Sequence, residues 1–438
     1  MKKIISVVLA LMLVLCLAGC GDSDESSKTE SGKGDKSEAA GTAAPDEAGY
    51  KFPDESVFDG ENDITLNVSV PENAVDVFKA QVNAFVEHYP NLKMDIKVTD
   101  TNYNEASALM LDDPQKQPDV FYTTSDMLGR LMSAEMLSPV PDTILDDIKT
   151  NNDTKAVKLA TADDKLYAYP VSCGNSCCLV YDKSVVSDAE AATLEGVLNS
   201  CKSSDRQFAM DCSNCFFSGT FTFTGGVIPD GFEDDGVTQK FLGYDEDAAV
   251  DTLKAFAKLM KDYKGTFVSE ESVVSIKNNK AAAWLMGEWN LKTAKEALGD
   301  NLGVAKYPTI RVNNEDKQMI SMQGYSFLGV HSGTYLLHKN TAHALAYFLS
   351  SEECQRQRME ALEQIPSNLT VMREVAEKPY MKAFIEQSDD SVPLVDLSGA
   401  FFVAIGKLGD TIYDENWIPD DKEATRTLLR DTISKICE

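Results

Sequence analysis

The sequence predicts an α/β protein built from two lobes, each a mostly parallel sheet flanked by helices. Strand-like and helix-like segments alternate from about residue 62 onward, which is the rhythm of βαβ units. The chain has 438 residues, and the part after residue 62 exceeds the roughly 250–300 residues at which one core stops growing. An apolar segment at the N-terminus further indicates that the protein works outside the cytoplasm.

Residues 1–19 have the layout of a secretory signal peptide. Lys2 and Lys3 precede an apolar run over residues 4–17, and small residues follow. The run is too short to span a bilayer, so a transmembrane anchor is the weaker alternative. The sequence ends this segment as Leu-Ala-Gly-Cys, which resembles a bacterial lipobox. We therefore expect Cys20 to be the lipid-modified first residue, held on the extracellular face of the cell membrane.

Residues 20–61 are predicted to be the lipidated cysteine and a flexible linker. The stretch from residue 22 to residue 45 is rich in Ser, Gly, Ala and charged residues and has no large apolar side chain. Such a segment cannot bury enough surface to offset its ordering entropy. It would therefore act as a spacer between the membrane and the folded body.

The charge of the chain excludes one broad class of partner. The formal net charge is −29, and removal of Lys2 and Lys3 with the signal peptide leaves −31. Nucleic-acid binding is not expected from so acidic a protein. The sequence has no P-loop, dinucleotide fingerprint or Gly-x-Ser-x-Gly motif, so we expect no cofactor, no catalytic residues and no enzyme activity.

Hydrophobic periodicity places the individual elements. The first part predicts strands over 63–70, 92–98 and 118–122, and helices over 75–89 and 127–136. A strand follows at 179–182. Further helices are predicted at 188–201, 245–263, 290–297, 340–350, 352–363, 367–376 and 422–437.

Five segments, in order along the body, resemble the extracellular solute-binding proteins of ABC importers, in the cluster that includes maltose-binding protein. The first, over residues 118–137, resembles that family's PD(I/V) … D … G segment. The second, residues 165–183, resembles its hinge strand. The others are KAAAWLMGEW at 280–289, the helix at 342–352 and the aromatic pair at 401–402.

The resemblance implies a two-lobed, type II periplasmic-binding-protein-like fold with the ligand in a cleft between the lobes. Lobe 1 would comprise residues 62–172 and 309–354, and lobe 2 residues 173–308 and 355–438. The hinge would pass through residues 171–173 and again near residues 307–308. The implied partners are a small solute and the membrane permease subunits that receive it, and the protein itself would be a monomer.

Asp126 falls at the family's cleft acid and would accept hydrogen bonds from ligand hydroxyls. The alternative is that Asp126 caps the N-terminus of the following helix. Met127 stands where the family often has Arg, so the usual bidentate donor is missing. Thr123 stands where the family has an aromatic ring, so Tyr122 or Tyr103 would have to supply one.

Trp289 matches the family's stacking tryptophan and is the strongest single candidate for a ligand contact. A buried structural role is the alternative for any tryptophan, and Trp284 fits that role better. Glu288, the neighbour of Trp289, is the polar candidate beside it.

Three further aromatic residues complete the predicted site. Phe402 matches a second stacking position, although Phe401 and Phe402 cannot both face a cleft. Phe216 lies where the family has another cleft aromatic, and Tyr103 lies in a loop after the second strand. Rings that stack on a sugar, together with planar polar groups, would suit a carbohydrate. A non-sugar solute is the alternative ligand.

Eight cysteines of the mature body depart from the family pattern. In an exported chain they suggest disulfides, with no pairing deducible from the sequence. Cys212 and Cys215 form a C-x-x-C motif, so a secreted thiol-redox or zinc-binding protein is the alternative function. The segment after Cys215 does not predict a helix, and no His pair has helical metal spacing. Structural cysteines and no bound metal are therefore the favoured interpretation.

Overall fold

The computed structural model describes residues 50–100, 118–232, 239–333, 338–395, 397–413 and 421–437. The predicted signal peptide, Cys20 and Tyr103 lie outside these residues. No helix in the described part of the chain combines the length and the apolar character that crossing a membrane requires.

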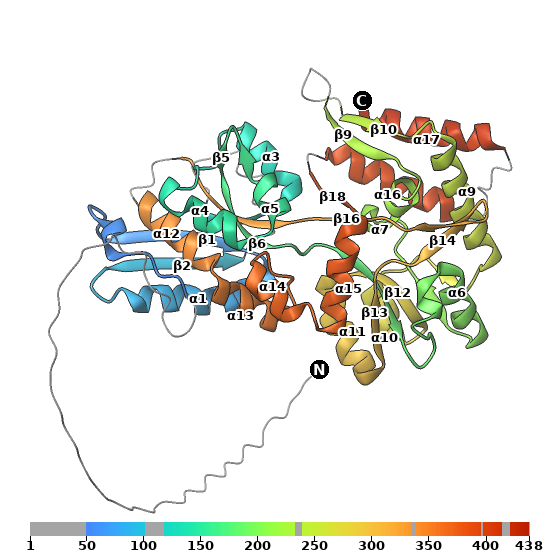
Figure 1. Ribbon diagram of the computed structural model, residues 1–438, viewed down its shortest axis with the longest axis horizontal. Coiled ribbons are helices and arrows are strands. Elements are labelled where there is room, and N and C mark those ends of the chain that lie inside the picture. The colour runs from blue at the N-terminus through green and yellow to red at the C-terminus, as the bar shows by residue number, and fades with distance from the viewer. Residues whose placement is uncertain are drawn as a thin grey trace, which may run out of the picture. The chain divides into compact units, whose positions relative to one another are not determined.

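The first sheet has five strands in the order β2-β1-β3-β17-β6 (Figure 1). Strands β1 (Ile64–Val70), β2 (Met94–Asp100) and β3 (Val120–Thr124) run parallel. Only β17 (Ser326–Val330) is reversed, pairing antiparallel with both β3 and β6 (Ala168–Ser172).

The second sheet repeats this pattern with the order β11-β8-β12-β7-β13. Here β8 (Gln207–Ala209), β11 (Phe267–Val268), β12 (Ala281–Gly287) and β13 (Leu302–Ala305) share one direction. The reversed strand is β7 (Cys177–Asp182). The predicted α/β class with two mostly parallel sheets is confirmed.

Two short segments, which we call the crossing segments, connect strands of the two sheets directly. Residues 173–176 connect β6 to β7, and residues 324–325 connect β16 (Ser321–Gln323) to β17. The first crossing agrees with the predicted hinge. The second does not: Tyr307 lies two residues after the end of β13 and is almost fully buried, and the chain stays beside the second sheet until β16. The chain crosses a third time further on, because the helix at Glu352–Leu362 packs on the one at Val75–His88, whereas the helix at Pro379–Gln387 packs on β13 and β7.

The side chains of β7 alternate between two apolar cores, as the two-residue period of a strand requires. Leu179 and Tyr181 belong to the core of the second lobe, whereas Cys178 and Val180 join the core that continues to the first sheet.

Helices flank both sheets; α1 and α12 pack beside the first sheet, and α6 and α10 beside the second. The described helices are α1 (Val75–His88), α3 (Ser125–Ser133), α4 (Asp142–Asn151), α5 (Thr154–Leu159), α6 (Leu194–Ser203), α7 (Cys215–Ser218), α8 (Thr220–Phe223), α9 (Asp247–Asp262), α10 (Ser272–Asn278), α11 (Leu291–Leu298), α12 (Lys339–Leu349), α13 (Glu352–Leu362), α14 (Leu369–Val375), α15 (Pro379–Gln387), α16 (Gly399–Tyr413) and α17 (Lys422–Cys437). The remaining described strands are β4 (Thr161–Ala162), β5 (Lys165–Leu166), β9 (Ile228–Phe232), β10 (Gln239–Leu242), β14 (Thr309–Val312), β15 (Glu315–Gln318) and β18 (Ser391–Pro393).

Most predicted elements lie within two or three residues of the observed ones, but the helix predicted at 188–201 begins late. Residues 190–192 form a 3-10 turn, and α6 starts only at Leu194 because Thr193 is extended and its side chain caps the helix by accepting from the Gly196 amide.

The predicted lobe limits remain a prediction. Two segments, however, pack against elements of the other lobe from the one to which these limits assign them. The β14–β15 hairpin packs on α6 and α9, with Ile310 and Val312 in the second core. Helix α13 packs on α1, and Met359 belongs to the first core.

Residues 50–58 are ordered, in contrast to the flexible linker predicted up to residue 61. We call this segment the N-terminal strap. Phe58 is buried with its ring edge-on to Tyr89 at 4.8 Å, and Phe52 stacks on Phe348 at 4.9 Å. Lys51 pairs with Asp147 at 2.6 Å. The strap folds because its aromatic rings bury apolar area that the residues before it cannot supply.

Replacing Phe58 with alanine should remove about 3 kcal/mol from the free energy of unfolding, because the change leaves a cavity in the first core. Urea denaturation measures this loss. Val57→Ala is the matched control, since the neighbouring Val57 side chain is 37% exposed. Equal stability of the two variants would show that the strap does not support the core.

Candidate functional site

Two adjoining cavities lie at the crossing segments and between elements of the two sheets. We call them the hinge cavity, of about 380 Å³, and the rim cavity, of about 290 Å³. Asn175 and Phe216 line both. The hinge cavity is lined by Pro71, Asn73, Ala74, Tyr122, Thr124, Asn175, Asn214, Phe216, Glu288, Trp289, Ser326, Leu362 and Gln364. The rim cavity is lined by Asp126, Met127, Arg130, Asn175, Phe216, Leu397, Gly399 and Phe402.

The two cavities bring together five of the six residues proposed from the sequence. Glu288, Trp289 and Phe216 line the hinge cavity, and Asp126 and Phe402 line the rim cavity with Phe216. The sixth, Tyr103, lies outside the described residues.

The aromatic side chains form the apolar part of the site. The rings of Trp289 and Phe216 meet edge to face, with centroids 5.8 Å apart, and Trp289 is 44% exposed. Trp284 has the expected structural role: it is 2% exposed, and its indole N–H donates to the Ser275 hydroxyl at 2.6 Å. An exposed tryptophan edge in a cavity is a suitable platform for an apolar ligand face.

The two neighbouring phenylalanines of α16 lie in different environments, because consecutive side chains of a helix point in different directions. Phe401 is fully buried, and its ring stacks on those of Phe223 and Phe241. Phe402 is half-buried and lines the rim cavity.

Asp126 does not cap its helix, because α3 begins one residue earlier at Ser125 and Thr124 occupies the cap position. The alternative of an N-cap role is therefore wrong. Burial raises the pKa of the Asp126 carboxyl, although a hydrogen bond from Thr124 opposes the shift. The side chain lines the rim cavity.

Arg130 supplies the guanidinium that the sequence lacked at residue 127. It lies four residues after Asp126, on the same face of α3, and lines the same cavity. Its Nη2 donates to the Leu397 carbonyl at 3.2 Å, so it also joins α3 to the segment before α16. Its spacing of four residues from Asp126, which places both side chains on one face of a helix, is the sequence signal that could have identified Arg130.

Of the two residues that could replace the family's aromatic ring before Asp126, Tyr122 lies at the hinge cavity and Tyr103 lies outside the described residues. Thr123 is fully buried, whereas Tyr122 lines the hinge cavity and its hydroxyl accepts from Gln364 Nε2 at 2.8 Å. Gln364 Oε1 is buried without a hydrogen-bond partner. Nothing in the local sequence marks Gln364, because it reaches the cavity from the loop after α13.

Asn175 and Asn214 were also missed, since each lies in a turn whose position depends on packing between distant segments. Asn175 has a positive φ of 63°, which asparagine tolerates better than most residues. Asn214 caps α7 by accepting from the Phe216 amide at 3.0 Å, and thereby fixes the backbone that carries the Phe216 ring.

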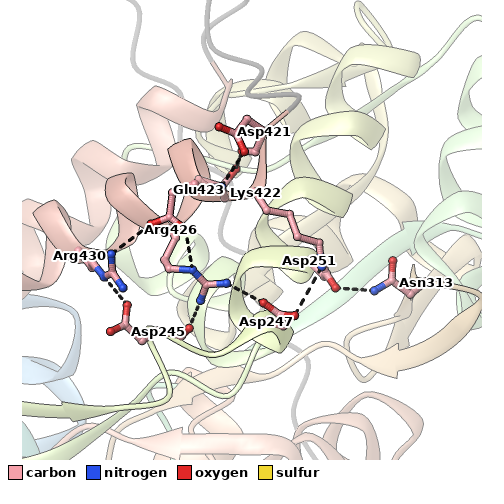
Figure 2. A network of polar contacts seen from close by, with 10 residues as sticks. Asp245, Asp247, Asp251, Asn313, Asp421, Lys422, Glu423, Arg426 and Arg430 are labelled. Carbon is pink, nitrogen blue, oxygen red and sulfur yellow. Dashed lines mark hydrogen bonds and ion pairs between the residues drawn. The ribbon is translucent and has the colours of Figure 1, made fainter.

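A larger hollow of about 740 Å³ lies elsewhere, beside α9, α17 and β14. Its charged groups are largely engaged: Asp251 accepts from Asn313 at 2.6 Å and pairs with Lys422 at 2.7 Å. Figure 2 shows how this network continues through Arg426 and Asp247 along α17 and α9. The network attaches α17 to α9, and the hollow lacks the grouped aromatic rings of the hinge cavity.

The structure forms no disulfide among seven of the described cysteines, Cys173, Cys177, Cys178, Cys201, Cys212, Cys215 and Cys354, in contrast to the disulfides that the sequence suggested. The prediction that no helix follows the C-x-x-C motif is also wrong, because α7 begins at Cys215. Burial nevertheless raises the pKa of the Cys215 thiol to about 12 and that of Cys212 further. A reactive cysteine requires a lowered pKa, so this environment disfavours redox chemistry.

Metal binding finds no support in the described residues either. They hold no group of three or more His, Cys, Asp or Glu side chains placed to bind a metal ion.

The geometry defines a class of protein: two mixed α/β lobes, joined by crossing segments, with an aromatic and polar cavity where they meet. The family model of bacterial extracellular solute-binding proteins matches residues 80–383. The chain therefore belongs to the bacterial extracellular solute-binding proteins.

Known proteins agree with this assignment. The maltotriose-binding protein of Pyrococcus abyssi is 22% identical over 331 residues, covering 74% of this chain and 69% of the relative. The maltodextrin-binding protein MalE1 of L. casei, solved without ligand, has a TM-score of 0.74 and 23% identity, with 85% of this chain and 99% of that chain covered. MalX of Streptococcus pneumoniae, solved with maltopentaose, has a TM-score of 0.67 and 21% identity, covering 85% and 99%.

We expect the thiols of Cys212 and Cys215 to be dispensable for ligand binding. The double substitution Cys212→Ser and Cys215→Ser should leave the circular dichroism spectrum and ligand affinity unchanged, and the native protein should reduce no disulfide substrate. In addition, a thiol reagent should modify the buried cysteines only after unfolding. Rapid labelling of the folded protein, or loss of binding in the double variant, would restore the thiol alternative.

Proposed function

We propose that this protein is the substrate-binding lipoprotein of an ABC importer that captures a carbohydrate and delivers it to membrane permease subunits. The observation that carries the proposal is the composition of the two adjoining cavities. The exposed ring of Trp289 and the half-buried rings of Phe216 and Phe402 line these cavities beside planar polar groups, which is the combination that a sugar ring and its hydroxyls require.

The polar groups of the cavities suit a hydroxyl-rich ligand in particular. Gln364 Oε1 is a buried acceptor without a partner, and Asn175 and Asn214 present amide side chains. Because Gln364 Oε1 has no hydrogen-bond partner among the described residues, the site favours a ligand whose hydroxyl donates to it. The names of the similar proteins, which describe maltotriose, maltodextrin and maltopentaose binding, support an α-glucan oligosaccharide as the first ligand to test.

The transport role follows from the family together with the fold. Ligand that contacts both lobes stabilises the closed arrangement, and the lobes move about the crossing segments. We propose that the protein acts as a monomer without a cofactor and performs no chemistry on its ligand. A saccharide panel in a thermal-shift assay tests the ligand class, because a bound ligand stabilises the folded state. No shift with any saccharide would contradict the carbohydrate proposal and leave a non-sugar solute.

Trp289→Ala should weaken binding of the best saccharide about tenfold or more. An aromatic contact contributes roughly 0.5–1.5 kcal/mol beyond its buried area, and 1.4 kcal/mol corresponds to tenfold in Kd. Isothermal titration calorimetry measures the change.

A matched pair on α16 tests the second ring of the site. Phe402→Ala should weaken binding, whereas Val403→Ala, at a side chain 72% exposed, should not. Unchanged affinity in both the Trp289 and the Phe402 variants would place the ligand elsewhere.

The proposed anchor depends on Cys20. Replacing Cys20 with serine should release the protein from the membrane fraction of its host into the medium and abolish labelling with a radioactive fatty acid. Retention in the membrane fraction after this change would contradict lipid anchoring at Cys20.

A further inference from the structure

Glu288 contacts the first crossing segment through both its main chain and its side chain. Its amide donates to the Ser176 carbonyl at 3.1 Å, and its Oε1 accepts from the Asn175 amide at 2.7 Å. A Cβ at Gly174 would lie 1.9 Å from Oε1, so only glycine allows this approach. One side chain therefore fixes the turn that carries Asn175.

The same turn holds the second crossing segment. The Asn175 carbonyl accepts from the Gly324 amide at 2.9 Å, and Gln323 Nε2 donates to the Cys173 carbonyl at 3.1 Å. Asn175 also lines both cavities, and Trp289 directly follows Glu288 in the chain. The position of Glu288 thus affects both crossings and the ligand site.

The second oxygen of the Glu288 carboxyl group, Oε2, is poorly hydrogen-bonded. Glu288 Oε2 and the Ser176 hydroxyl are inaccessible to solvent, and neither has a hydrogen bond of good geometry. The titratable groups facing Glu288 from the crossing segment and β7 are the thiols of Cys173, Cys177 and Cys178, whose pKa values are raised by burial. Asp126 and Arg130 line the adjoining rim cavity, not the hinge cavity.

We propose that Glu288 is a proton-linked positioning residue, which carries its proton on Oε2 in this conformation and thereby sets the Asn175 turn and the ligand cavity. Burial raises the pKa of Glu288 to about 8, and the hydrogen bond that the Asn175 amide donates to the carboxyl opposes the shift. Ionisation leaves a buried charge without a counterion, so the ionised form favours a turn that admits a donor to Oε2. The part of the proposal that concerns ligand affinity rests on the proposed function.

The sign of the pH dependence follows from the raised pKa. Between the ordinary glutamate value near 4.5 and about 8, the folded protein holds a proton that the unfolded chain has lost. The stability due to this group is present below the ordinary value and is lost as the pH rises to about 8. Within this pH range, the contribution of Glu288 to the folding equilibrium constant falls by up to tenfold for each unit that the pH rises.

Glu288→Gln tests this linkage without ligand, because glutamine keeps an acceptor for the Asn175 amide but cannot ionise. Compared with wild type, the variant should gain stability as the pH rises from about 5 to about 8, measured by urea denaturation at several pH values. The contributions of other titratable groups, such as Asp126, to the pH dependence of stability cancel in this comparison, because both proteins have these groups. Glu296→Gln, at an exposed position on α11, is the control and should show no such gain. A stability difference that does not vary with pH would overturn the proton linkage.

The connection to the cavity has its own readout. The fluorescence of Trp289, obtained as the difference between wild type and Trp289→Phe, should change between about pH 7 and pH 9 in ligand-free protein. The change should be absent in the Glu288→Gln background. A flat wild-type signal would overturn the connection, and this measurement decides even if the glutamine variant does not fold.

Ligand affinity provides the third measurement. With maltotriose as the probe, the wild-type association constant should fall several-fold from about pH 6 to pH 9 and stay flat in Glu288→Gln. The same pH dependence in both proteins would overturn the coupling to binding. Absence of binding by every saccharide would count against the proposed function alone, because the two ligand-free measurements do not depend on it.

Discussion

The close approach of the two crossing segments is the constraint on which the site depends. Gly174 and Gly324 leave no room for a side chain, since a Cβ at Gly324 would lie 2.5 Å from the Asn175 amide group. This proximity allows Asn175 to bond both Glu288 and the second crossing. The same turn then presents Asn175 to both cavities. The proposed ligand site and the proposed axis of lobe movement therefore share these residues.

The cavities combine rigid and adaptable contacts. Phe216 is held by the Asn214 cap and by its edge-to-face contact with Trp289, so the rings meet a ligand in fixed positions. Gln364 reaches the hinge cavity from the loop after α13, and Arg130 reaches the rim cavity from α3; both have longer side chains with several hydrogen-bonding groups. In the proposed site, fixed rings would select an apolar ring face, and the longer polar groups would adjust to its hydroxyls.

The fold class and most elements could be predicted from the sequence, because periodicity records which face of each helix or strand is buried. Trp289 and Phe402 could be proposed because their motifs are local. Asn175 and Gln364 could not, since each reaches the site from a turn whose place is set by distant contacts. The second crossing near residue 324 was missed for the same reason: the β14–β15 hairpin is short and polar, and its packing on α6 and α9 leaves no local signal.

If Cys20 carries a lipid anchor, the N-terminal strap determines which lobe bears the attachment to the membrane. Its partners, Tyr89, Phe348 and Asp147, all belong to elements around the first sheet. If the protein is anchored at Cys20, any pull from the anchor acts on the first lobe, and the second lobe moves without load. Lobe closure then does not change the distance that residues 21–49 must span. If a membrane permease receives the ligand, as we propose, the local concentration of the binder at that permease is then the same before and after ligand capture.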